Sequence, residues 1–207
     1  MIHMQYTVDD LKTLPLRAIV ALAVRCARRV ERLASLPDGH PDAASVKAAA
    51  DEALRVAETF ARGEPCPSAE QAVEAIEAVH DAASGEIIRE NAYASIVRAI
   101  HAAATAARAV AEEHEPGERL LMGGHGNPRL ASVAGISADL AAMGAFTAAL
   151  NAAEAVGSTD EFTRWAAEDF RKLQKLKLGE YPEAGDPIDP SPAGPLGPLW
   201  PKPDFGL

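Results

Sequence analysis

The segment PLRAIVALAVRCARRVERL, residues 15–33, decides the fold class because it is two-sided when wound as an α-helix. At about 100° per residue, its five arginines fall within an arc of about 120°, and apolar side chains occupy the opposite side. We therefore predict an amphipathic helix whose apolar face packs in a core and whose arginine face is exposed. The arginines are Arg17, Arg25, Arg28, Arg29 and Arg32, and the apolar side holds Ile19, Leu22, Ala23, Cys26, Ala27, Val30 and Leu33.

Three kinds of partner fit this arginine face. Acidic side chains of the two following helices could pair with it inside the protein. It could instead bind an acidic partner protein, or it could bind nucleic acid or another anionic ligand. Guanidinium groups form paired hydrogen bonds with carboxylates and phosphates alike, so the residue type alone does not choose among them. The internal candidates are Asp51, Glu52, Glu58, Glu70, Glu74 and Glu77.

Alanine dominates the apolar composition, since 48% of the 207 residues are hydrophobic and only 5% are aromatic. Alanine is the best helix former because it loses no side-chain entropy in a helix. We predict an all-α protein, in which residues 1–178 form one bundle of about six helices and residues 179–207 form an extended proline-rich tail packed on it.

Capping and stop signals place the helices along the chain. Pro15 suits the first turn of a helix that should end before Pro37, and Gly63 suits the end of the next helix. Ser158 and Glu161 have the spacing of a capping box. The predicted elements are a short turn at 8–11 and helices at about 15–36, 42–62, 68–84, 86–113, 127–156 and 158–178, the third and fourth being either separate or one kinked rod.

The tail contains eight of the chain's 15 prolines, a density that excludes a regular helix or a central strand. Several of its side chains are nevertheless too apolar for a solvated linker. We expect an extended, polyproline-like strap that docks on its own bundle through Leu196, Leu199 and Trp200. Docking onto another protein is the alternative.

The net charge and the N-terminal sequence argue against several classes of function. A net charge of −10 repels nucleic acid, and the longest wholly apolar run, Ala18 to Val24, is too short to span a bilayer. The residues MIHMQYTVDDL lack the pattern of a secretory signal. We expect a cytoplasmic protein that binds neither nucleic acid nor membrane, with Cys26 and Cys66 as reduced thiols.

Few residues have the spacing of a metal or cofactor site. Glu77 and His80 share one helix face, but a helical di-iron site needs a second such pair and two further glutamates. His101 lies among alanines, where a packing role is the simpler interpretation. The loop GGHGNP, residues 123–128, lacks the lysine and hydroxyl of a phosphate-binding loop. We therefore predict no metal and no cofactor.

One short pattern suggests a catalytic alternative. Arg108 lies six residues before His114, which resembles the Arg-His motif of the HEPN-type helical ribonucleases. That resemblance implies that both side chains act on a scissile phosphate. Ala109 departs from the polar residue that commonly follows the arginine, and Glu112, Glu113 and Glu115 would repel RNA.

A longer pattern resembles the alanine-rich helical immunity proteins of bacterial polymorphic-toxin systems. It consists of ALAVRCARRVERL, ALRVAETFARGE, AVEAIEAVHDAA and IVRAIHAAATAARA, within residues 14–111. The corresponding residues include Cys26, Ala27, the stop at Ala61 to Glu64, His80 and His101. The resemblance implies a helical protein that binds another protein and blocks it, rather than one that performs chemistry.

We expect a non-catalytic protein-binding module, with toxin neutralisation as its specific form. The five arginines or an acidic face would contact the partner. The negative net charge of the chain suits a basic toxin, because opposite electrostatic potentials speed the association of two proteins. The alternatives are an Arg108/His114 ribonuclease and a structural or interaction protein of another kind. A monomer and a dimer are both compatible with the sequence.

Overall fold

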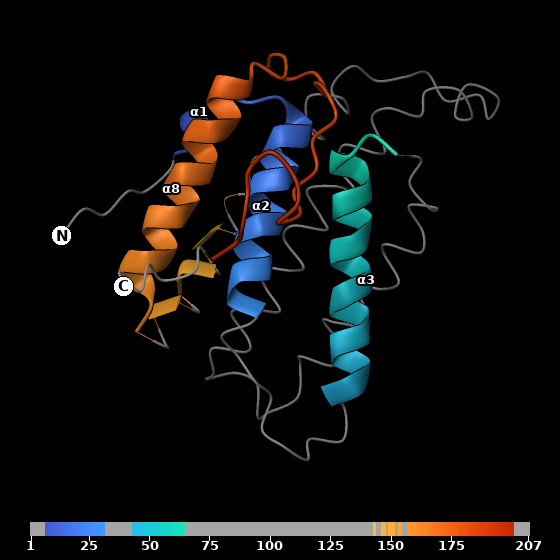
Figure 1. Ribbon diagram of the computed structural model, residues 1–207, viewed down its shortest axis with the longest axis vertical. Helices are drawn as coiled ribbons and strands as arrows, with labels where there is room; N and C mark the ends of the chain where they lie inside the picture. Colours follow the sequence, from blue (N-terminus) through green and yellow to red (C-terminus); the bar gives the residue numbers. More distant parts are fainter. Residues whose placement is uncertain are drawn as a thin grey trace, which may run out of the picture.

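A computed structural model describes residues 7–31, 43–64, 143, 146–147, 149–151, 153–154 and 157–200, and its helices are labelled as in Figure 1. Within these ranges the regular secondary structure is α-helical, with no β-strand, which confirms the predicted all-α class for the described residues. The helices are α1 (Val8–Leu11), α2 (Leu16–Glu31), α3 (Ala43–Ala61) and α8 (Thr159–Leu176). The described positions between 143 and 154 are helical too. The helices predicted at 68–84 and 86–113 lie outside the described residues.

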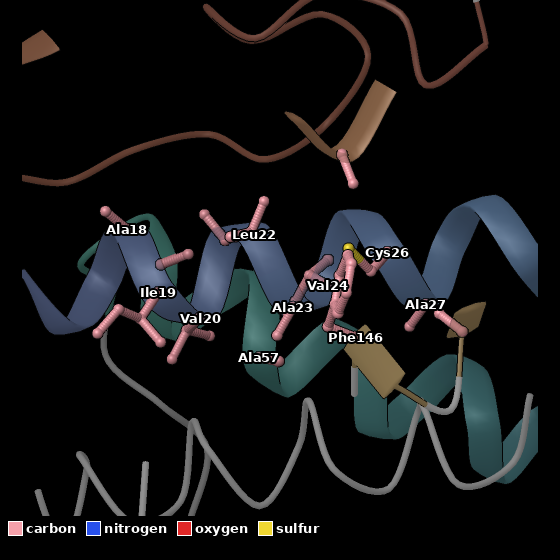
Figure 2. Packing of buried hydrophobic residues seen from close by; sticks show 14 of the residues in the cluster. Ala18, Ile19, Val20, Leu22, Ala23, Val24, Cys26, Ala27, Ala57 and Phe146 are labelled. Carbon is pink, nitrogen blue, oxygen red and sulfur yellow. The ribbon is translucent and has the colours of Figure 1, made fainter. Parts of the chain in front are cut away.

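Helix α2 is the central element of this part of the structure, with α3 on one side and α8 on the other (Figure 1). Its apolar side is buried as predicted, since Ile19 and Val30 are both 0% exposed. Figure 2 shows this packing, in which Ala57 of α3 and Phe146 lie among the apolar side chains of α2. Many of these side chains are alanines, whose small volume lets the helices approach closely.

The start of α2 is completed by a segment far away in the sequence. The main-chain N–H groups of Leu16 and Arg17 donate to the carbonyls of Glu183 and Ala184, at 3.0 and 2.9 Å. The first N–H groups of a helix lack partners within it, so these two bonds act as a main-chain cap. The preceding helix, α1, is capped locally, because Thr7 and Asp10 form a reciprocal capping box.

Both ends of α8 differ from the expected pattern. The predicted capping box at Ser158 and Glu161 is wrong, because the Ser158 side chain makes no capping hydrogen bond. Ser158 has φ −108° and ψ 20°, whereas a capping side chain normally projects from extended backbone. At the other end Lys177 adopts the left-handed conformation that usually falls to glycine, with φ 52°.

Segment 177–200 turns back across the helices without forming another helix (Figure 1). Its first turn is closed by the Asp186 N–H, which donates to the Leu178 carbonyl at 2.6 Å. The Ile188 N–H then donates to the carbonyl of Ala61 at the end of α3, at 2.8 Å. Residues 188–200, which we call the C-terminal strap, continue from this point over α2 and α8.

Candidate functional site

Two arginines of α2 and one aspartate of α8 form a buried ionic cluster, which we call the arginine cluster. Arg25 and Arg29 are 0% exposed and Asp169 is 1% exposed. Arg25 donates from Nε and Nη2 to the two carboxylate oxygens of Asp169, at 2.6 and 3.2 Å. Arg29 donates from Nη2 to Oδ2 of the same carboxylate, at 2.5 Å. Asp169 is therefore shared by both guanidinium groups.

The C-terminal strap completes the hydrogen bonding of the arginine cluster. Arg25 donates to the carbonyls of Pro190 and Pro198, at 3.0 and 3.2 Å. Arg29 donates from Nε to the carbonyl of Leu199, at 2.9 Å. Strap carbonyls thus meet arginine donors that would otherwise lie buried without acceptors.

Lys172 extends this donor surface along α8. Its Nζ donates to the carbonyl of Leu196 at 2.8 Å. We call Arg25, Arg29, Asp169 and Lys172 together the strap-binding face. Its donors bind main-chain oxygens of the strap. The expectation of an extended, polyproline-like strap is wrong for residues 191–197, which form two consecutive hydrogen-bonded turns.

The strap's own polar groups are used mostly within the strap. Asp189 accepts hydrogen bonds from the N–H and the hydroxyl of Ser191, both at 2.9 Å. The N–H groups of Gly194 and Gly197 donate to the carbonyls of Ser191 and Gly194, each at 3.0 Å. The strap therefore contributes neutral oxygens to the arginine cluster, while its own carboxylate is engaged locally.

Apolar side chains also hold the strap against the helices. Ile188, Leu196 and Leu199 are 3%, 0% and 5% exposed. Trp200 is half-buried against the same core, and its Nε1 donates to the Arg29 carbonyl at 3.3 Å. The structure thus places the predicted docking residues Leu196, Leu199 and Trp200 on the helices.

The arginine cluster carries more positive than negative charge. Two guanidinium groups face one carboxylate, and the three strap carbonyls that complete the cluster are neutral. Among the described residues, Arg29 Nη1 is buried with no hydrogen-bond partner. A buried donor without an acceptor costs free energy, so this side of the cluster is incompletely satisfied.

The expectation of a continuous exposed arginine face is wrong for Arg25 and Arg29, because α8 and the strap cover them. Arg28, in contrast, pairs with α3: it donates to Asp51 at 3.0 Å and to Glu58 at 2.9 Å. Pairing with the following helix was one of the predicted alternatives, and it is confirmed for Arg28.

Arg17 and Arg32 complete the predicted set of partner-binding arginines. Arg17 is partly buried, donates to the Gly185 carbonyl at 2.7 Å and lies 5.8 Å from the centre of the Phe60 ring. Arg32 lies outside the described residues. The described arginines of this face therefore contact several different partners within the protein.

Asp169 is the residue of the arginine cluster that our sequence analysis missed. It occupies the buried side of α8, together with Phe162, Ala166 and Leu173. The helical spacing of 162, 166, 169 and 173 places a carboxylate within an apolar stripe. A carboxylate in such a position needs a buried counter-charge, and this signal could have identified Asp169 as a partner for the arginines.

Cys26 lies in the same core as the arginine cluster. Burial raises the pKa of the Cys26 thiol from 9.0 to about 12, although the charge of Arg29 opposes the shift. The thiol therefore stays protonated at neutral pH, which makes it a poor nucleophile. This environment agrees with its predicted role as a reduced core residue.

The other residues with candidate chemistry lie outside the described residues: Cys66, Glu77, His80, His101, Arg108, His114 and the loop 123–128. Within the described ranges, His, Cys, Asp and Glu side chains form no group of three or more that could hold a metal ion. None of the described helices has the length and apolar character needed to cross a membrane.

Comparison with known proteins returned no match among family models, curated proteins or solved structures.

Proposed function

We propose that the protein is a non-catalytic helical module that binds another protein. The observation that carries this proposal is the strap-binding face, where arginine and lysine donors already bind main-chain carbonyls of the strap. Side-chain donors that bind main-chain oxygens recognise a peptide by its backbone, and flanking apolar contacts add affinity. The chemistry needed for binding a polypeptide is therefore present on α2 and α8.

The specific form of this function is neutralisation of a toxin, as the resemblance to immunity proteins implies. The net charge of −10 supports a partner that is basic overall, because opposite potentials accelerate association. The sequestration of Arg25 and Arg29 agrees with this charge layout, since it removes two cations from the surface.

The test is a search for a partner with the full chain. The tagged protein is used to capture partners from its native host, and each captured protein is then purified and titrated against it by calorimetry. A saturable complex with fixed stoichiometry supports the proposal, and protection of cells from that partner's toxicity supports the specific form.

An activity assay provides the opposing outcome. The purified chain is incubated with structured and single-stranded RNA, beside a His114→Ala variant. RNA cleavage that the wild-type chain performs and the variant has lost would assign the protein to the ribonucleases and overturn the proposal. The expected result is that neither sample cleaves RNA.

A further inference from the structure

The strap-binding face carries more positive charge than the carboxylate within it can balance. Arg25 and Arg29 share a single carboxylate, and Arg29 Nη1 has no hydrogen-bond partner among the described residues. The strap supplies only neutral carbonyl oxygens to these donors. A carboxylate adds the attraction between opposite charges to its hydrogen bonds with a guanidinium, and it can accept two of them in parallel, whereas a carbonyl oxygen offers no charge. A segment that brought a carboxylate would therefore fit this face better than the strap does.

The position at which a carboxylate would act is the carbonyl of Leu199. That oxygen accepts from Arg29 Nε at 2.9 Å, on the edge of the guanidinium that also donates from Nη2 to Asp169, whereas the unpartnered Nη1 lies on the other side of the group. A peptide that ended at this position would present two carboxylate oxygens and a negative charge in place of one neutral oxygen. The residues before it could keep the main-chain contacts that the strap makes to Arg25 and Lys172.

We propose that the C-terminal strap is an internal occupant of a peptide-binding face, and that a segment of a partner protein with a carboxylate facing Arg29 competes with it. This inference rests on the proposed protein-binding function and adds the site and the chemistry of the partner. The strap would then hold the face closed until such a segment displaces it. Because the strap is tethered, its effective concentration is high and the partner segment must bind more tightly than an untethered strap.

A pair of synthetic peptides tests the charge requirement directly. Both have the sequence IDPSPAGPLGPL of residues 188–199 and carry an N-terminal fluorescein; one ends in a free carboxylate and the other in an amide. They differ only at the group that would face Arg29. We expect the acid to bind the full chain at least about fivefold more tightly than the amide, as measured by fluorescence anisotropy.

Loosening the strap tests the competition. Leu196→Ala weakens the attachment of the strap but leaves the added peptide unchanged, so the acid peptide should bind this variant at least about tenfold more tightly than the parent. Leu176→Ala, on the exposed part of α8, is the matched control and should bind like the parent. Ile188→Val is a milder strap variant with an expected gain of a few fold, and it serves if Leu196→Ala is too unstable.

Trp200 reports whether the strap itself moves. In a Trp165→Phe background Trp200 is the only tryptophan of the chain, and the peptides contain none. Displacement of the strap should shift Trp200 emission to longer wavelength, with the same midpoint as the anisotropy change.

Three results would overturn the inference: equal binding of acid and amide, no binding to either strap variant, or binding without a change in Trp200 emission. Each of these leaves a partner found by capture and calorimetry unaffected. Failure of this inference is therefore distinguishable from failure of the proposed function.

Discussion

Arg25 and Asp169 form a two-pronged ion pair, with the guanidinium Nε 2.6 Å and Nη2 3.2 Å from the two carboxylate oxygens. Both side chains are excluded from solvent, and Arg29 shares the same carboxylate. A buried charge that loses its partner keeps its full desolvation penalty, so removing one carboxylate would leave two guanidinium groups uncompensated.

Asp169→Asn should therefore lower the free energy of unfolding by about 3–5 kcal/mol. The matched control is Glu168→Gln, the adjacent residue of α8, whose surface pair with Arg171 at 2.8 Å is worth about 0–1 kcal/mol. Urea denaturation followed by circular dichroism measures both variants. Equal losses of stability would show that the arginine cluster does not depend on its carboxylate.

The strap should contribute to stability through its apolar contacts. Leu196→Ala removes a side chain that is 0% exposed, and we expect a loss of about 2–5 kcal/mol. Leu176→Ala removes the same atoms from a residue that is 41% exposed, with an expected change within about 0.5 kcal/mol. Thermal and urea unfolding of the two variants provide the comparison, and a strap that does not stabilise the fold would make them alike.

Two glycines with similar positive φ angles allow the cost of steric crowding to be distinguished from the cost of backbone strain. Gly157 and Gly185 have φ of +73° and +76°, but a Cβ at Gly185 would lie 2.5 Å from Pro15 Cβ, whereas one at Gly157 would have nothing within 4 Å. Gly157→Ala should cost about 1 kcal/mol from backbone strain alone. Gly185→Ala should cost about 2–4 kcal/mol, because crowding adds to that strain. Unfolding free energies that did not differ would contradict the close packing of this turn on Pro15.

Cys26 should be protected from thiol reagents in the folded protein. A Cys66→Ser variant leaves Cys26 as the only thiol, and iodoacetamide at pH 8 should alkylate it slowly in buffer and rapidly in urea. The reason is that burial raises the pKa of Cys26 to about 12, so little thiolate forms at that pH. Fast alkylation under native conditions would contradict this.

The raised pKa of Cys26 also predicts a dependence of stability on pH. The folded state favours the neutral thiol, so this stabilisation is fully present below the ordinary pKa of 9.0 and is lost as the pH rises towards about 12. Between those values the wild-type chain should lose more stability than a Cys26→Ala variant. If the free energy of unfolding fell equally with pH in the two proteins, Cys26 would not be the cause of the loss.

Local signals in the sequence predicted the local parts of the structure. Pro15 marked the start of α2, Gly63 the end of α3, and the apolar spacing of residues 19–30 the buried side of α2. Such signals act over a few residues, and the physical effects behind them, helix capping and amphipathic burial, are equally local.

The arginine cluster could not be assembled in the same way. Its carboxylate lies 144 residues from Arg25, and its other acceptors are main-chain carbonyls, which every residue has. A sequence pattern can show that Arg25 and Arg29 share a helix face, but it does not show what covers that face. The wrong expectation of an exposed stripe arose because charged side chains are seldom fully buried unless they are paired.

The cap that residues 183 and 184 provide for α2 bears on how the chain folds as it is made. Segment 183–184 leaves the ribosome about 150 residues after the end of α2, which at cellular speeds is roughly 10–30 s later. Until then α2 lacks its N-terminal acceptors, and until residue 169 has emerged it also lacks the counter-charge of Asp169. The nascent α2 is consequently a cationic helix with an exposed apolar face, and it must be protected from aggregation until α8 has been synthesised. The yield of folded protein should therefore depend on the rate of translation.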